Sequence, residues 1–109
     1  MVERSAIPEQ GRAQALAEVE ALRRRIDLLD EELVRLLNAR ASCALEIGRL
    51  KEALGMPIYQ PEREQEVLAH VRAANPGPLD EAAVVRLFER IIDEARRLER
   101  LAQQARGRL

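Results

Sequence analysis

Apolar residues recur at alternating spacings of three and four along the first half of the chain, which is typical of a helix packed along a seam. The pattern runs from Leu16 to Leu54, and Gly48 is the one strong helix breaker inside it. A single helix over this stretch would be roughly 58 Å long. A compact domain of this size has a radius of gyration of about 13 Å. We therefore expect the helix to be bent or broken, or a second chain to cover its overhang. The seam consists of Val19, Leu22, Ile26, Leu29, Leu33, Leu36, Cys43, Ile47, Leu50 and Leu54.

Two shorter helical stretches follow, and glycine and proline residues mark their limits. Gly55 predicts the C-terminal stop of the long helix, and Pro61 predicts the first residue of the second helix. The second helix is expected to end by Asn75, before the break at residues 76–78. Asp80 then predicts the N-cap of a third helix. No stretch alternates like a β-strand, so the predicted fold class is all-α, with one long, one short and one medium helix.

We expect a single helical domain over residues 14–104, beginning near Gln14. Residues 1–13 lack apolar periodicity and are expected to form a disordered lead-in, and residues 105–109 a frayed tail. A chain of 109 residues suits one domain of this kind.

The composition argues against several classes of function. With 18 basic and 19 acidic residues, the chain lacks the basic excess that nucleic-acid and membrane-surface binding require. Its aromatic residues are only Tyr59 and Phe88, which leaves no platform for base stacking. One Cys and one His cannot build a Cys/His metal site, and we expect no metal and no cofactor. No signal-peptide core or membrane-length apolar run occurs, so the expected location is the cytoplasm.

Basic residues in and beside the seam do not fit the pattern of a simple helical core. Arg40 occupies the seam position between Leu36 and Cys43, and a buried guanidinium needs a partner or a ligand. Lys51 lies on nearly the same face roughly 16 Å along the axis, which leaves space for a small anion between the two side chains. Arg23 lies roughly 25 Å from Arg40 and could meet it only in an antiparallel second copy. From spacing alone, a coiled-coil dimer with inter-chain salt bridges explains these charges equally well.

Most other charged residues are expected on solvated helix faces, and Arg96 and Arg97 are among them. Three positions stand apart from this group. Arg63 and Glu64 open the second helix just after the turn that folds it back on the first, and Glu99 borders the apolar stripe of the third helix.

Several segments, taken together and in order, resemble the all-helical chorismate mutases over about residues 16–102. The break at residues 75–78 looks most like mutase domains that stand alone or precede a 3-deoxy-heptulosonate 7-phosphate synthase. The matching segments are Leu22-Arg23-Arg24-Arg25-Ile26-Asp27-Leu28-Leu29-Asp30, Leu36-Leu37-Asn38-Ala39-Arg40, Ile47-Gly48-Arg49-Leu50-Lys51, Pro57-Ile58-Tyr59-Gln60-Pro61-Glu62-Arg63-Glu64 and Leu87-Phe88-Glu89-Arg90-Ile91-Ile92.

The resemblance implies an intertwined homodimer that converts chorismate to prephenate in aromatic amino-acid biosynthesis. This Claisen rearrangement uses no proton transfer, metal or cofactor, and depends on conformational restriction and electrostatic stabilisation. The resemblance further implies that Arg40, together with Arg23 of the partner chain, binds the two substrate carboxylates. Lys51 would donate to the breaking ether oxygen.

The remaining implied contacts come from the second and third helices. Arg63 would complete the cationic wall, and Glu64 would accept a hydrogen bond from the ring hydroxyl. The backbone at Gln60 would contribute to the hydroxyl site, and Ala95 and Glu99 match substrate-contacting positions of the third helix.

Three of these positions depart from the family pattern. Gln60 stands where an Asp is expected, which weakens the predicted helix cap. Ala95 stands where many members have Ser, which removes a hydroxyl donor. Glu99 stands where some members have Gln, and a Glu can donate only when it is protonated. Burial beside Leu98 would raise the pKa of Glu99, while Lys51 would lower it. The hypothesis is that Glu99 is a neutral donor, so that turnover falls as pH rises.

Other functions remain open at this point. An isochorismate-pyruvate lyase would share the fold and the cationic site. A regulatory module could use the same pocket to sense chorismate or prephenate and control a 3-deoxy-heptulosonate 7-phosphate synthase. A simple coiled-coil adaptor would tolerate apolar residues at Arg40 and Lys51.

Overall fold

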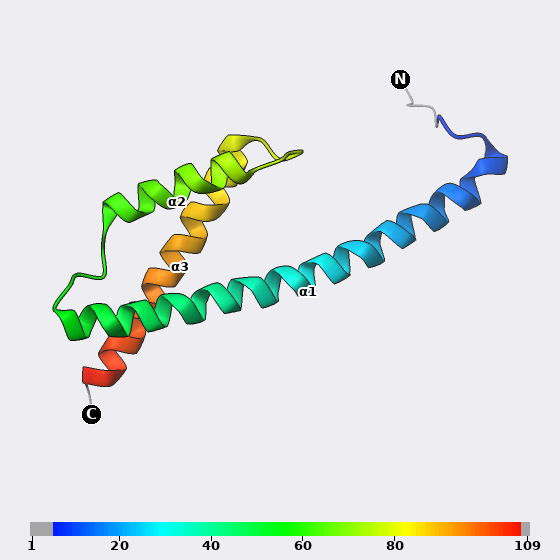
Figure 1. Ribbon diagram of the computed structural model, residues 1–109. Helices are drawn as coiled ribbons and strands as arrows, with labels where there is room; N and C mark the ends of the chain where they lie inside the picture. The colour runs from blue at the N-terminus through cyan, green and yellow to red at the C-terminus, as the bar shows by residue number, and fades with distance from the viewer. Residues whose placement is uncertain (1–5, 108–109) are drawn as a thin grey trace, which may run out of the picture. The chain divides into compact units, whose positions relative to one another are not determined.

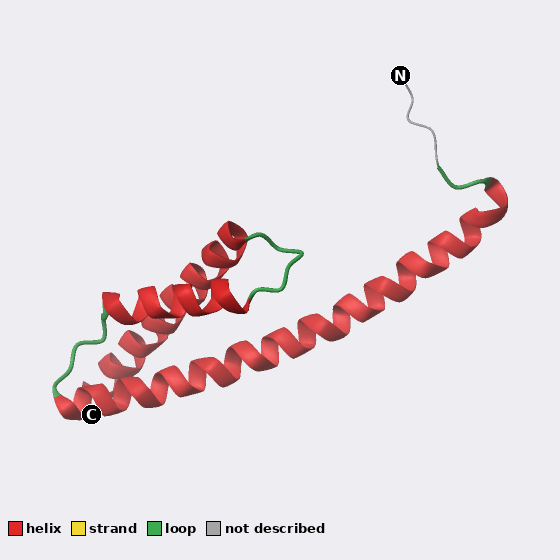
Figure 2. Ribbon diagram, turned by 45° about the horizontal axis from the view of Figure 1, so that its top comes forward, coloured by secondary structure: helices red, strands yellow, loops and turns green. Residues whose placement is uncertain are grey.

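The computed structural model describes residues 6–107, which form three helices joined by two short connections (Figure 1). Helix α1 spans Glu9–Leu54, α2 spans Pro61–Ala74 and α3 spans Glu81–Gly107. Figure 2 shows helices and loops only, and no strand occurs among the described residues. The predicted all-α class, with one long, one short and one medium helix, is confirmed. Within residues 6–107, no helix has an apolar stretch of the length needed to cross a lipid bilayer.

The ends of the helices correct the predicted limits at both termini. α1 begins at Glu9, earlier than the start predicted near Gln14. Pro8 fixes its own φ angle and its carbonyl accepts a hydrogen bond from the Gly11 N–H at 2.9 Å, which closes the first turn early. The predicted lead-in is therefore helical over residues 9–13, while residues 1–5 lie outside the described residues. α3 likewise continues through Gly107, into the predicted tail.

The limits in the middle of the chain follow the predicted signals. Gly55 has a φ of 71°, and the Met56 N–H donates to the Lys51 carbonyl at 2.8 Å, as in a glycine-terminated helix. Pro61 is the first residue of α2. Asp80 caps α3, since its Oδ1 accepts a hydrogen bond from the Ala83 N–H at 2.7 Å. The Gln60 side chain makes no such bond at the start of α2, as the weaker cap predicted there requires.

The chain divides into two compact units, residues 1–36 and residues 37–109. The described part of the first unit contains residues 9–36 of α1, more than half of that helix, and its seam side chains are exposed. They are between 42% and 57% exposed, and nothing else in residues 6–36 covers them. The exposed seam residues are Val19, Leu22, Ile26, Leu29, Leu33 and Leu36.

The second unit contains the end of α1 together with α2 and α3. α2 and α3 pack against each other, and the Asn75 side chain organises the turn between them by donating to the Leu79 carbonyl at 2.7 Å. Val84 and Ile92 are the buried apolar residues of α3. The end of α1 is tied to the end of α3 because Arg106 Nε donates to Glu52 at 2.8 Å. Within this unit, Arg40 and Lys51 of α1 line the same cavity as residues of α3.

Candidate active site

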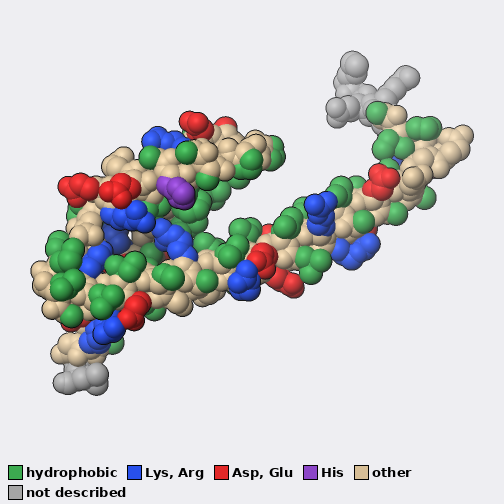
Figure 3. Space-filling view, in the orientation of Figure 1, with side chains coloured by type: hydrophobic (Ala, Val, Ile, Leu, Met, Phe, Trp, Pro, Cys, Tyr) green, Lys and Arg blue, Asp and Glu red, His purple; other side chains and the backbone are tan. Residues whose placement is uncertain are grey.

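A cavity of about 370 Å³ opens in the second unit, lined by the end of α1, the start of α2 and the middle of α3. Figure 3 shows the side chains of Lys and Arg gathered around this hollow. Seven of the eight predicted site residues line it, and apolar side chains form the rest of its wall together with Arg96. The seven are Arg40, Lys51, Gln60, Arg63, Glu64, Ala95 and Glu99.

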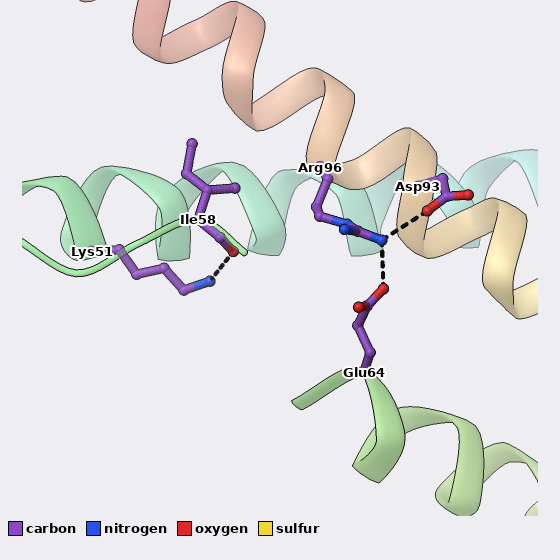
Figure 4. A network of polar contacts seen from close by, with 5 residues as sticks. All are labelled: Lys51, Ile58, Glu64, Asp93 and Arg96. Carbon is purple, nitrogen blue, oxygen red and sulfur yellow. Dashed lines mark hydrogen bonds and ion pairs between the residues drawn. The ribbon is translucent and has the colours of Figure 1, made fainter. Parts of the chain in front are cut away.

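The α1 wall of the cavity carries two cations. Lys51 is partly buried, and its Nζ donates to the Ile58 carbonyl at 3.3 Å (Figure 4). An ammonium has three N–H donors, so this bond orients Lys51 and leaves donors for a ligand. Arg40 is also partly buried and forms no ion pair within residues 6–107. Both side chains therefore present positive charge to the cavity.

The start of α2 places one residue at the rim of the cavity and another on its wall. Arg63 is exposed, and its Nη1 donates to Glu66 at 3.1 Å. Glu64 is partly buried, and its backbone N–H donates to the Gln60 carbonyl at 3.3 Å, within the first turn of the helix. The helix geometry thus aims the Glu64 carboxylate at α3.

Arg96 is the functional candidate that the sequence did not identify. Its Nη2 donates to Glu64 at 2.5 Å and to Asp93 at 2.8 Å, as Figure 4 shows. Its guanidinium carbon also lies 4.9 Å from the centroid of the Tyr59 ring, in cation–π range. The expectation that Arg96 lies on a solvated helix face is wrong. The signal that identifies it is its position three residues before Glu99, on the same face of α3.

Glu99 is buried opposite a glycine of α1. Only 8% of Glu99 is exposed, and its Oε2 has no hydrogen-bond partner among the described residues. A Cβ atom added at Gly48 would lie 3.2 Å from the Glu99 Cγ, so Gly48 provides the space that this side chain occupies. Burial raises the pKa of Glu99, against the opposing effect of the Lys51 and Arg96 charges.

Arg23, the eighth predicted residue, belongs to the first unit and does not line the cavity. Its Nη1 donates to Glu20 at 2.9 Å, and both side chains are exposed. This is an ordinary pairing of residues three apart on a helix surface. A role for Arg23 in the site of a partner chain stays a prediction.

The cavity suits an anionic ligand. Four cations line it, Arg40, Lys51, Arg63 and Arg96, against the carboxyl groups of Glu64 and Glu99. Glu64 is already paired with Arg96, and burial raises the pKa of Glu99. Because the four cations outnumber the two carboxyl groups, the charge left over is positive even when Glu99 is ionised, as a small dicarboxylate requires. Within the described residues, no three His, Cys, Asp or Glu side chains are grouped as metal ligands would be.

Residues 22–100 match the family described as chorismate mutase type II. The chain belongs to this family. Among curated mutases, it is 46% identical over 87 residues to the bifunctional chorismate mutase/prephenate dehydratase of Pseudomonas aeruginosa. That match covers 75% of this chain but only 24% of the bifunctional protein.

Relatives of more similar length are also chorismate mutase-like. The chorismate mutase of Methanocaldococcus jannaschii is 30% identical over 80 residues, covering 72% of this chain and 81% of the relative. The 4-amino-4-deoxychorismate mutase of Streptomyces pristinaespiralis is 35% identical over 96 residues, covering 87% of this chain and 74% of the relative.

Two solved chorismate mutases share the fold. The enzyme from Thermus thermophilus (form II) is 41% identical with a TM-score of 0.75, covering 76% of this chain and 94% of that one. The enzyme from Helicobacter pylori, solved in complex with prephenate, is 32% identical with a TM-score of 0.75, covering 81% and 96%. The three-helix chain is thus a chorismate mutase fold.

Proposed function

We propose that this chain is a chorismate mutase, an intramolecular isomerase that converts chorismate to prephenate in aromatic amino-acid biosynthesis. The observation that carries the proposal is the cavity that gathers Arg40, Lys51 and Glu99, in a chain of the chorismate mutase family. The relatives named above are mutases, alone or fused to a dehydratase, which favours this reaction over lyase chemistry.

The rearrangement breaks one C–O bond and forms one C–C bond within the same molecule, so the protein needs to supply only position and charge. Arg40 and Arg63 hold the substrate carboxylates and bring the enolpyruvyl arm over the ring. Lys51 donates to the ether oxygen on which negative charge develops. Neutral Glu99 donates to the same oxygen, and Ala95 leaves room beside it.

The other end of the substrate lies against α2 in this proposal. Glu64 accepts a hydrogen bond from the ring hydroxyl, using lone pairs that Arg96 leaves unoccupied. The backbone at Gln60 completes the hydroxyl site. No residue in this scheme forms a covalent bond to the substrate.

A homodimer completes the proposed site. The exposed seam of the first unit is a continuous apolar stripe, and a second copy of the chain is the partner that its periodicity predicts. Arg23 of the partner subunit then supplies the additional guanidinium for a carboxylate. This accounts for an arginine beside the seam that has only a surface ion pair in its own chain.

A product assay tests the proposed reaction. Purified protein is incubated separately with chorismate and with isochorismate, and the products are identified by chromatography. Prephenate from chorismate is the expected result. Pyruvate from isochorismate would identify a lyase instead, and saturable chorismate binding without product would identify a sensing module. Failure to bind either compound would support the alternative of a coiled-coil adaptor.

Subunit mixing tests the shared site. Arg23→Ala and Arg40→Ala are each expected to be inactive alone. After exchange, both lesions fall in one site of a mixed dimer and the other site is intact, so about a quarter of the wild-type activity should return. An affinity tag on one variant identifies the mixed dimers, and no recovery of activity in them would refute the contribution of Arg23. A cytoplasmic location and a 3-deoxy-heptulosonate 7-phosphate synthase partner stay predictions.

A further inference from the structure

Arg96 differs from the other cations of the cavity because its carboxylate partner, Glu64, also lines the cavity. Its guanidinium donates to Glu64 at 2.5 Å, and the two side chains are each 23% exposed. Arg40 and Lys51 have no carboxylate partner among the described residues. Arg96 therefore compensates Glu64, and it adds no free charge for a substrate carboxylate.

The position of Arg96 does not depend on Glu64 alone. Asp93 accepts a second hydrogen bond from the same Nη2 at 2.8 Å, and the Tyr59 ring packs against the guanidinium at 4.9 Å. These contacts come from α3 and from the loop before α2, whereas Glu64 lies on α2. The guanidinium is thus held in place from two sides and presented to the Glu64 carboxylate.

This arrangement decides what Glu64 can recognise. A lone, partly buried carboxylate attracts a cation more strongly than a neutral hydroxyl. A carboxylate already paired with a guanidinium still accepts a hydrogen bond from a hydroxyl, but it offers little net negative charge to an ammonium. An ammonium at that position would also face the guanidinium itself.

We propose that Arg96 is a specificity-determining residue, which makes the Glu64 end of the cavity accept a ring hydroxyl and reject a ring ammonium. The inference rests on the proposed function, because it takes Glu64 as the group that meets the ring substituent. The substrate class it selects is a cyclohexadiene dicarboxylate with a neutral oxygen substituent. The class it excludes is the analogue with a protonated amine at the same carbon.

The test compares kcat/KM for chorismate and for 4-amino-4-deoxychorismate in the wild type and in Arg96 variants. Arg96→Gln removes the charge but keeps N–H donors for Glu64, and Arg96→Leu removes both. Each is expected to lower the preference for chorismate by about tenfold, as loss of one charge compensation implies. Arg96→Lys keeps the charge and should keep most of the preference.

Arg97→Gln is the matched control. Arg97 is the next residue of α3, is 63% exposed, pairs only at 3.8 Å with Glu94 and does not line this cavity. The same change of charge there should leave the preference unaltered. Circular dichroism shows whether each variant is folded. If Arg96→Leu does not fold, Arg96→Gln alone provides the test.

The outcomes separate the inference from the function beneath it. Normal chorismate turnover with an unchanged preference in Arg96→Gln would overturn the inference alone, and so would an equal shift in Arg97→Gln. If the ion pair only holds α2 to α3, the variants would lose stability and the preference would not move. Absence of chorismate turnover by the wild type would refute the proposed function and this inference together.

Discussion

The two units of the chain treat charge and apolar surface in opposite ways. In the first unit, Arg23 and Arg35 pair with glutamates three residues earlier, entirely on the exposed surface, while the leucines of the seam lie open. In the second unit, Val84 and Ile92 are buried, and Arg96 and Glu64 pair in a partly buried cavity. Surface pairs of this kind stabilise a protein by about 0.2–1 kcal/mol, whereas burying an ion requires close compensation.

This difference separates the residues that bear on association from those that bear on ligand binding. In the first unit the apolar stripe is the feature that bears on association, and Arg23 beside it is the one charge proposed to act in a partner's site. In the second unit, the partly buried pair of Arg96 and Glu64 and the cations Arg40 and Lys51 line one cavity, so these charges bear on a ligand. The predictions below separate these roles, beginning with the largest expected effect.

Replacement of Lys51 by Met should lower kcat/KM for chorismate by about 10²–10³, since it removes a donor from the developing charge. The methionine keeps the apolar length of the side chain, so the fold should persist. Arg49→Met is the control, because Arg49 is exposed and pairs only with Glu46. Steady-state kinetics measure both. A Lys51→Met variant with a normal kcat would show that Lys51 does not stabilise the developing charge.

Replacement of Leu29 by Asp should raise the dissociation constant of the proposed dimer by about 100-fold, because a carboxylate would be buried in the seam of each chain. Sedimentation equilibrium measures the constant. Leu28→Asp makes the same change one residue earlier, outside the seam, and should have little effect. Equal dissociation by the two variants would show that the stripe does not define the interface.

Replacement of Glu99 by Gln should flatten the decline of activity at high pH, with a difference of about tenfold one unit above the pKa of Glu99. Burial raises this pKa, so the folded state holds its proton more tightly than the unfolded chain does. Stability contributed by that proton is present at low pH and is lost as pH rises through the raised value. Rate measurements across the pH range test this. An unchanged profile in Glu99→Gln would exclude Glu99 as the neutral donor.

Replacement of Gln60 by Asp should stabilise the second unit by about 1 kcal/mol, since α2 begins without a side-chain cap. Urea unfolding measures the change in free energy. Gln60→Asn provides a cap without a charge and should recover most of the gain. If neither variant moves the midpoint, Pro61 and the backbone already satisfy the start of the helix.

The sequence predicted the features that depend on local chemistry. Gly55, Pro61 and Asp80 mark their helix ends because each acts on neighbouring backbone groups, and the structure confirms all three. The start of α1 was predicted too late, because the periodicity of the seam begins after the helix does. Pro8, which closes the first turn, carries no periodic signal.

Features that depend on how helices face one another could not be predicted in the same way. Arg96 and Arg97 are adjacent in the sequence, and only the position of α2 decides which of them meets Glu64. Cys43 belongs to the seam, yet it is exposed and lines the cavity within a single chain. The spacing placed Arg40 and Lys51 on nearly the same face of one helix, but Glu99 was grouped with them only because of the family resemblance. Their spacing alone allowed a coiled coil.

Gly48 provides the space in which the Glu99 carboxyl is buried. The Glu99 side chain can be buried at this place because Gly48, on the facing helix, has no Cβ atom. A Gly-to-Ala change is a single-base substitution in any glycine codon, and it would push that carboxyl toward water or into tighter contact. Under the proposed function, a change at this non-polar position would shift the pH range of activity while every group that contacts the substrate stays in place.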